Sequence, residues 1–345
     1  MRQLPWPPGT ATAVGPMPGT DIVEATAVVF GELPEFPHVP DLPDRGVGAD
    51  AIGRTAALLL DLPVELVPTG YRVAARPGHD HRRAVDLLRW DLDALEEAAA
   101  RAATRGGVLK LQLAGPWTLA ASVELARGHR VMTDPGALRE FTTSLTEGVA
   151  AHIGELSERT GMRVVVQFDE SVLPEVLAGA LPTPSGYGTV PSVPAPEVTA
   201  LLKPAVDELE QVSGTPVVLR CEGPRPPVAV LRDAGVKAVS LDATLLPGAP
   251  GRVLDEIGEA WEADTVLLLG LVPATPPAER VELRSLAEPA LWLVDRLGFG
   301  RSLLAERAVP TPTAGFAGVD REWARRALGL SRDLGKAFVE PPEGW

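Results

Sequence analysis

The sequence predicts an α/β protein built as a single (β/α)₈ TIM barrel that covers residues 1–345. Short apolar runs alternate with amphipathic segments about eight times, an order typical of a parallel sheet with helical crossovers. Eight such units in a chain of 345 residues favour a closed barrel, because one unit takes about 30 residues plus insertions. An open doubly wound sheet is the alternative. No Gly-x-Gly-x-x-Gly motif follows the first expected strand, so a dinucleotide-binding fold has no support.

Each expected element follows from its residue pattern. Runs rich in Val, Leu and Ile that end at Gly, Pro or Asp predict strands at residues 11–15, 64–69, 108–114, 162–168, 216–219, 236–241, 265–271 and 302–310. Amphipathic periodicity predicts helices at residues 21–30, 49–60, 82–105, 119–126, 135–160, 196–212, 226–234, 253–261, 278–297 and 321–338. Asp134 and Pro135 are typical of a helix start. The proline-rich segment 31–48 is expected to be irregular.

Composition excludes several classes of partner. The formal net charge is −14 at pH 7, and no window holds the basic patch that nucleic acids or anionic membranes require. A single cysteine excludes an intramolecular disulfide and suits a reducing compartment. The N-terminal residues show no apolar segment of a secretion signal, and the longest apolar run, residues 266–272, is too short to span a membrane. We therefore expect a cytoplasmic protein that binds a small molecule.

A dense run of Pro and Gly at residues 182–196 predicts a long loop. Loops of this length in compact domains are often lids or binding loops. Because the loop leaves the strand at 162–168, we expect it to cover the end of the barrel where the strands terminate. Tyr187, between two glycines, is the side chain expected to reach a ligand.

The chemistry is expected where the strands end, because the loops that follow barrel strands share one face and hold the site. Polar or conspicuous residues stand at these ends. They are Gly115, Pro116 and Trp117, then Asp169 and Glu170, then Arg220, Cys221 and Glu222, then Asp242, and finally Thr311 and Thr313. Adjacent carboxylates at the end of a core strand are costly to bury unless something pairs with them, which favours a binding role for Asp169 or Glu170. Asp242 and Asp169 have a helix-capping alternative, and Cys221 could be a small buried hydrophobe.

Three motifs resemble the cobalamin-independent methionine synthases. Gln167-Phe-Asp-Glu170 resembles their Gln-x-Asp-Glu-Pro-Ala-Leu motif, Lys110 to Pro116 resembles their Gly-Pro segment, and Thr12 to Thr20 resembles their first Thr-x-Gly-Ser-Phe-Pro segment. The similarity covers essentially the whole chain and resembles the catalytic half of the long enzymes or their single-domain relatives. It implies a (β/α)₈ barrel related to uroporphyrinogen decarboxylase. It also implies methyl transfer from a methyltetrahydrofolate-type donor to a thiol such as homocysteine, which would be held on zinc.

The resemblance also implies where the zinc ligands would stand, and here the chain departs from the family. Leu219 occupies the His position, Cys221 matches the first Cys, Asp242 replaces the Glu, and Ala314 replaces the second Cys. Two donors cannot close a tetrahedral zinc site, so the zinc site is degraded and no cofactor is predicted. The pair His79 and His81 is a candidate for replacement ligands. The family's ammonium-binding Asp is Asp169.

These observations give one leading hypothesis and two alternatives. The leading one is a methionine synthase-like methyltransferase with Cys221 and Asp242 as catalytic residues. Its substrate would contact Asp169, Glu170, Gly115, Trp117 and Tyr187. One alternative is a non-catalytic or regulatory barrel that binds a small molecule. The other is a uroporphyrinogen decarboxylase-like enzyme, which would need early arginines such as Arg2, Arg45 and Arg54 to hold propionate groups.

Overall fold

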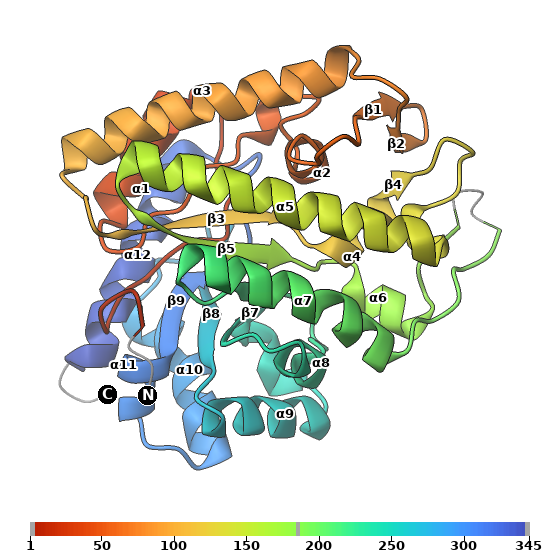
Figure 1. Cartoon of the computed structure of the whole chain (residues 1–345). Coiled ribbons are helices and arrows are strands. Elements are labelled where there is room, and N and C mark those ends of the chain that lie inside the picture. The colour runs from red at the N-terminus through yellow and green to blue at the C-terminus, as the bar shows by residue number, and fades with distance from the viewer. Residues whose placement is uncertain (1–3, 184–186, 342–345) are drawn as a thin grey trace.

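A curled parallel sheet forms the centre of the molecule (Figure 1). The computed structural model describes residues 4–183 and 187–341. The sheet has six strands in the order β3-β5-β6-β7-β8-β9. They are β3 (Val108–Ala114), β5 (Arg163–Asp169), β6 (Val218–Arg220), β7 (Ala238–Asp242), β8 (Val266–Val272) and β9 (Ala308–Pro312). The predicted α/β class and the predicted parallel sheet are confirmed.

Two extended segments, residues 10–17 and 37–42, lie between β9 and β3. They carry isolated bridges rather than regular strands. The backbone hydrogen bonds that link them run from Thr12 N to Pro310 O (3.3 Å), from Asp41 N to Gly15 O (3.1 Å), from Met17 N to Asp41 O (2.8 Å), from Lys110 N to Pro37 O (2.8 Å) and from Val39 N to Lys110 O (2.8 Å). We refer to the six strands and these two segments together as the ring. Two of its eight members are thus irregular, where the sequence predicts eight strands.

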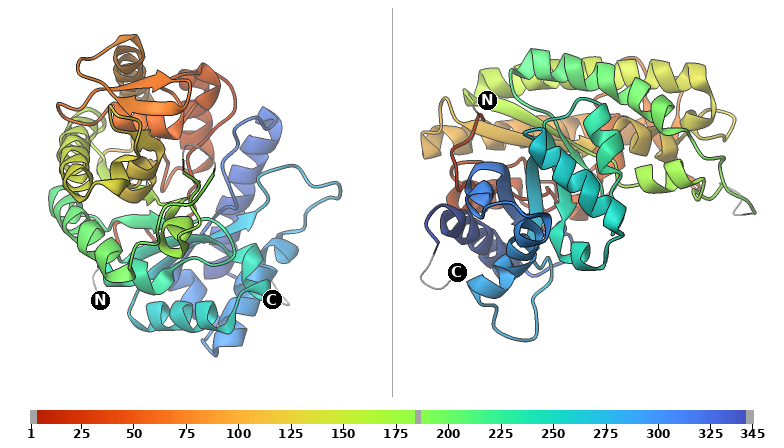
Figure 2. Two further views of the ribbon diagram at one scale, coloured as in Figure 1. Left: turned by 90° about the vertical axis from the view of Figure 1, so that its right-hand side faces the viewer. Right: turned by 90° about the horizontal axis from the view of Figure 1, so that it is seen from below.

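Helices cover the outside of the ring (Figures 1 and 2). They are α1 (Ile22–Glu32), α2 (Ala51–Ala56), α3 (His79–Ala102), α4 (Pro116–Ser122), α5 (Pro135–Thr160), α6 (Leu173–Ala178), α7 (Ala195–Ser213), α8 (Val228–Asp233), α9 (Gly251–Glu262), α10 (Leu283–Leu297), α11 (Ser302–Arg307) and α12 (Arg321–Val339). Short 3₁₀ helices lie at Pro43–Arg45, Val131–Thr133 and Ala243–Gly248. No helix among the described residues has the length and apolar character needed to cross a membrane.

Two of the expected strands are wrong in place or extent. Residues 64–69, expected as the second barrel strand, form β1 (Val64–Val67), which pairs with β2 (Gly70–Val73) and β4 (Val123–Glu124) in a separate small sheet. The second ring position belongs instead to segment 37–42, whose prolines lack the N–H groups of a regular ladder. Residues 302–307 are helical, so only the end of the expected 302–310 strand lies in the sheet.

The interior of the ring is divided into two layers. Near the amino ends of the strands it is apolar, and the Trp6 ring stacks on Phe36 with centroids 4.5 Å apart. The strands contribute to this apolar layer Val108, Val165, Val218, Ala238, Val266, Leu268 and Val309. One step further along the strands the inward positions are polar, among them Lys110, Gln167 and Arg220, all buried. The ring is therefore closed at one end and polar toward the other.

The apolar layer predicts a stability difference between two tryptophans. Trp6 is 5% exposed, whereas Trp90 on α3 is 58% exposed. Trp6→Ala should lower the free energy of unfolding by about 3–5 kcal/mol, because it leaves a cavity beside Phe36. Trp90→Ala should change it by less than about 0.5 kcal/mol. Urea unfolding of both variants measures the difference, and equal losses would contradict the layered interior.

Candidate functional site

Two opposite charges stand side by side where β5 and β6 end. Asp169 is the register partner of Arg220 in the parallel pairing of these strands. Asp169 is partly exposed and Arg220 is 7% exposed. Among the described residues, no ion pair within 4.0 Å joins them; Arg220 Nη1 instead contacts Glu222 Oε1 at 2.6 Å. We call the end of the ring that holds them the mouth.

A buried relay supports Asp169 from behind. Lys110 Nζ donates to Gln167 Oε1 at 2.8 Å, and Gln167 Nε2 donates to Asp169 Oδ1 at 2.7 Å. The same amide group therefore links a buried amine to the carboxylate. Since Oδ1 is held by Gln167, Oδ2 is the oxygen left for a ligand at the mouth.

Burial and neighbouring charges act on both ends of this relay. Burial lowers the pKa of Lys110 to about 7, although the charge of Asp169 opposes the shift. Burial also raises the pKa of Asp169, against the attraction of Arg220 and Lys110. An ammonium group placed at the mouth would favour the ionised form of Asp169 and so offset its desolvation.

Glu170 has a different position from its neighbour Asp169. It is completely buried and accepts three hydrogen bonds from the first turn of α4. They come from Trp117 N (3.0 Å), Thr118 N (2.8 Å) and Thr118 Oγ1 (2.9 Å). The carboxylate thus satisfies backbone donors at a helix start, and burial raises its pKa to about 7. Its geometry is that of a support for α4 rather than of a group facing a ligand.

Gly115 and Trp117 belong to this support. A Cβ atom on Gly115 would lie 2.4 Å from the carboxyl carbon of Glu170, so only glycine allows this approach. The Trp117 side chain is 2% exposed, and its indole N–H donates to Val198 O on α7 at 3.4 Å. The structure thus places both residues behind the mouth, where they pack; contact with a substrate stays a prediction for them.

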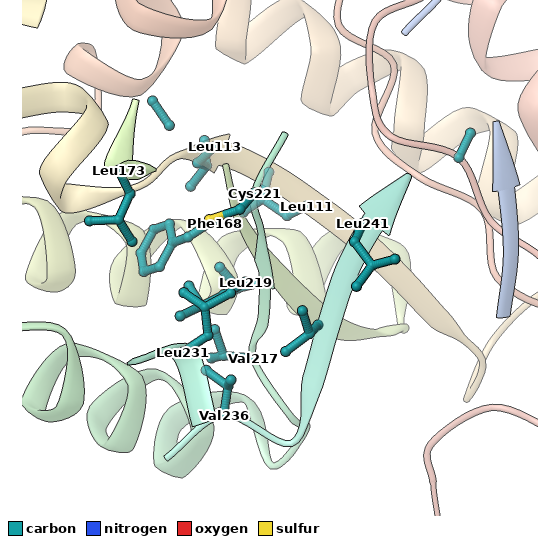
Figure 3. Packing of buried hydrophobic residues seen from close by; sticks show 14 of the residues in the cluster. Leu111, Leu113, Phe168, Leu173, Val217, Leu219, Cys221, Leu231, Val236 and Leu241 are labelled. Atoms are coloured by element: carbon teal, nitrogen blue, oxygen red, sulfur yellow. The ribbon is translucent and has the colours of Figure 1, made fainter. Parts of the chain in front are cut away.

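The thiol of Cys221 points away from the polar interior. Cys221 is 1% exposed and lies with Phe168, Leu111 and Leu113 in the apolar core on the helix side of the sheet (Figure 3). Its Sγ contacts Glu170 O at 3.4 Å, and burial raises the pKa of the thiol well above its ordinary value. Leu219, two residues earlier, faces the same way. The geometry gives the expected catalytic role of Cys221 no support.

Asp242 ends β7 at the mouth and is partly exposed. Its Oδ1 accepts hydrogen bonds from Thr244 N at 2.9 Å and from Thr244 Oγ1 at 2.6 Å. These bonds cap the 3₁₀ helix that follows. The carboxylate therefore has the capping geometry that the sequence offers as its alternative role, and a catalytic role for Asp242 stays a prediction.

The residues present do not fit a zinc ion. Cys221 and Leu219 face the helix layer, whereas Asp242 lies at the mouth and caps its helix. Within the described ranges no group of three or more His, Cys, Asp or Glu side chains could hold a metal ion. His79 and His81 do not supply the missing ligands, because neither belongs to such a group among the described residues. The His79 side chain is 85% exposed and pairs with the adjacent Asp80 at 3.3 Å. No chemical step is therefore assigned to zinc here.

The loop expected to act as a lid lies only partly within the described residues, because 184–186 fall outside them. Leu181 and Val190 are joined by a backbone hydrogen bond of 2.8 Å, and Pro182 pairs with Thr189 in an antiparallel bridge. The loop follows α6 at the same end of the molecule as the mouth (Figure 2). Tyr187 is 99% exposed, so its contact with a ligand stays a prediction.

Sequence reasoning missed Lys110 and the role of Gln167 as a link. A signal was present in the strand at 108–114, where Lys110 and Gln112 alternate with leucines. Such alternation in a strand that is buried on both faces marks polar groups that point into the ring. Arg220 was placed at the correct strand end, but its partnership with Asp169 depends on the register between β5 and β6.

Comparison with known proteins supports the fold alone. No protein-family model matches the chain, and no curated protein matches it. A B12-independent methionine synthase from Shewanella sp. W3-18-1, in complex with selenomethionine, aligns with a TM-score of 0.58 at 10% identity over 96% of this chain and 98% of that chain. A methyltransferase from Methanosarcina mazei aligns with a TM-score of 0.52 at 16% identity over 96% and 94% of the two chains. The chain thus shares its overall fold with these two proteins.

The buried Glu170 predicts a pH dependence of stability. An unfolded glutamate ionises near its ordinary pKa of 4.5, whereas Glu170 in the folded protein ionises near 7. Between these values the unfolded state binds fewer protons, so the free energy of unfolding falls as pH rises. The free energy of unfolding of the wild type, relative to that of Glu170→Gln, should therefore fall by about 3 kcal/mol as the pH rises across this window. Urea unfolding from pH 4 to 8 measures it, with exposed Glu158→Gln as the control; a pH-independent difference would contradict the buried carboxyl.

The orientation of Cys221 predicts the outcome of an attempt to restore zinc. The triple variant Leu219→His, Asp242→Glu and Ala314→Cys supplies all the family's donor types. Because positions 219 and 221 face the helix layer, the new donors should not converge with the one at 242. Elemental analysis after incubation with zinc and gel filtration should find well under one zinc per chain. Stoichiometric zinc would show that the strand presents Cys221 to the mouth.

Proposed function

We propose that this protein binds a small zwitterionic molecule of the amino-acid class at the mouth. In this proposal Asp169 binds the ammonium group and Arg220 binds the carboxylate. The observation that carries it is the register pair Asp169 and Arg220, which stand next to each other at the strand ends without an ion pair between them in the described residues.

The chemistry of the two groups matches that of a zwitterion. A carboxylate held on one oxygen by Gln167 keeps the other for an ammonium, and a guanidinium offers several N–H donors in a fixed plane. Charge-assisted hydrogen bonds of this kind are stronger than neutral ones. A ligand that carries both charges would pair with both residues at once and leave the net charge of the site unchanged, which limits the cost of desolvation.

Methyl transfer is a second candidate, favoured by the methyltransferase-like fold. In this hypothesis the bound molecule is a thiol amino acid such as homocysteine, and the donor is of the methyltetrahydrofolate type. Since the zinc donors do not converge, thiol activation would depend on a group other than protein-bound zinc. A barrel that binds an amino acid without catalysis accounts for the same geometry.

The early arginines that a uroporphyrinogen decarboxylase-like enzyme would need are not available in the described structure. Arg45 makes two hydrogen bonds to Asp91, at 2.7 and 2.9 Å. Arg54 is 3% exposed and pairs with Asp41. Arg2 lies outside the described residues. The carboxylates that hold Arg45 and Arg54 are themselves buried, so these guanidinium groups are not free to hold propionate groups. Arg220 differs because its partner Glu222 is half-exposed, but it is a single cation.

The test begins with a thermal-shift screen of the standard amino acids and L-homocysteine, followed by calorimetry on every compound that stabilises the protein. Truncating one partner of a partly desolvated ammonium–carboxylate pair costs about 2–5 kcal/mol. Asp169→Asn should therefore weaken binding by at least tens of fold, and Arg220→Met should do the same. Exposed Asp255→Asn is the matched control and should bind as wild type.

Two kinds of result would overturn the proposal. One is a screen in which no amino acid raises the melting temperature of the wild type. The other is a ligand whose affinity is equal in wild type and Asp169→Asn, with both proteins folded. Loss of folding in Asp169→Asn would show instead that the carboxylate is needed to offset Lys110 and Arg220.

A further inference from the structure

Behind the mouth lies an arc of polar groups, of which the proposed amino-acid site uses only Gln167 and, through it, Lys110. Five successive members of the ring contribute one inward-facing residue each. They are Thr311 on β9, Thr12 on segment 10–17, His38 on segment 37–42, Lys110 on β3 and Gln167 on β5. The bridge between His38 and Lys110 pairs these two residues, and the hydrogen bond from Thr12 N to Pro310 O joins the members that carry Thr12 and Thr311. Gln167 is the register partner of Gln112 and contacts Lys110 through its side chain. We call these five residues the inner arc.

The inner arc has unfilled hydrogen-bonding capacity. Thr12 is 0% exposed and Thr311 is 1% exposed, and neither hydroxyl has a hydrogen-bond partner within the described part of the chain. The carbonyl oxygen of the nearby Gln112 side chain is also buried without a partner. Buried polar groups are almost always hydrogen-bonded in folded proteins. Two unpartnered hydroxyls that face the same interior therefore leave donors available to a polar group.

The charge of the inner arc is positive or neutral. The bond from Lys110 Nζ goes to a neutral amide, Gln167, and no carboxylate of the described chain lies within ion-pair distance of Lys110. Its other electrostatic neighbours are Asp169, one step nearer the mouth, and Arg220. His38 is completely buried beside it, and burial together with the charge of Lys110 holds the pKa of His38 well below its ordinary value. Glu222 is half-exposed and pairs with Arg220.

The two ends of the ring differ in what lies next to the inner arc. On the amino side the apolar layer fills the ring, with Trp6 stacked on Phe36. On the carboxyl side the arc leads through Gln167 to the partly exposed Asp169.

We propose that the inner arc is an anion subsite that takes a carboxylate or another small oxyanion, with Lys110 as its cation and the hydroxyls of Thr12 and Thr311 as neutral donors. Each oxygen of such an anion can accept from one of these donors. The subsite and the ammonium site use different groups to contact a ligand, although Gln167 connects Lys110 to Asp169. It would hold either a second acidic group of the mouth's ligand or a separate small acid.

Anion binding at the inner arc is coupled to protonation of Lys110. Burial lowers the pKa of free Lys110 to about 7, and an adjacent anion favours the charged amine and raises that pKa. At pH above 7, anion binding therefore takes up a proton. Affinity for the anion should be greatest below pH 7 and should fall toward tenfold per pH unit above it.

The test observes Lys110 directly. The chain has lysines only at positions 110, 203, 237 and 336, and the last three are exposed. Carbon-13 labelling of lysine side chains thus gives a few NMR signals, and Lys110→Met assigns one of them. Sodium acetate is the probe, against sodium chloride at equal ionic strength. Acetate should move the titration midpoint of the Lys110 signal upward by about one pH unit or more and should leave Lys203 unchanged.

Variants separate the subsite from the proposed amino-acid site. Thr12→Val combined with Thr311→Val keeps the side-chain shape, removes both hydroxyls and should weaken the acetate response at least tenfold. Asp169→Asn should weaken amino-acid binding by at least tens of fold. It should also lower the Lys110 midpoint, because the charge of Asp169 no longer raises it, but acetate should still move that midpoint upward, so that either idea can fail without the other. An identical Lys110 midpoint in acetate and chloride would overturn the anion subsite, as would an undiminished response in the double threonine variant.

Discussion

Buried charge inside the ring is the constraint on which the site depends. A lysine that is completely enclosed by strands must be neutralised or paired, because an isolated buried cation is strongly unfavourable. Lys110 meets this requirement partly by a lowered pKa and partly through Gln167, which connects it to Asp169. Each of these three side chains therefore restricts the position of the others. Asp169 is kept at the strand end with one oxygen committed to the protein and one available at the mouth.

The division of the interior into two layers explains why chemistry is confined to one end. The apolar layer below supplies burial, whereas the polar layer above supplies charge in a region of low dielectric, where hydrogen bonds to charged groups are strong. Around the mouth, other side chains position elements. Glu170 fixes the start of α4, and Asp242 caps the helix after β7. The carboxylates at the strand ends thus divide between support and binding. Asp169 and Asp242 are both partly exposed, and each has one oxygen outside these hydrogen bonds. Of the two, Asp169 is the one whose register partner is an arginine, Arg220.

Much of the fold could be predicted from local pattern. The strand at 108–114 and the helix at 135–160 agree with the structure residue for residue, because strong periodicity and clear end signals define both. Segment 37–42 could not be predicted as part of the ring. Its prolines suppress the strand pattern, and its place depends on long-range hydrogen bonds to residues 15 and 110. The site was predictable as a set of strand ends but not as an arrangement. Whether Cys221 or Arg220 faces inward is decided by the alternation of side chains along β6, and a one-residue difference in register exchanges the two faces.

The central claim is that Asp169 and Arg220 together bind a zwitterion at the mouth. A crystal structure with the tightest-binding amino acid from the screen tests it most directly. The account predicts the ligand's ammonium nitrogen within hydrogen-bonding distance of Asp169 Oδ2 and its carboxylate on the Arg220 guanidinium, with the bond from Gln167 to Asp169 Oδ1 retained. A ligand bound outside the ring, or one bound at the mouth with its ammonium group remote from Asp169, would contradict it.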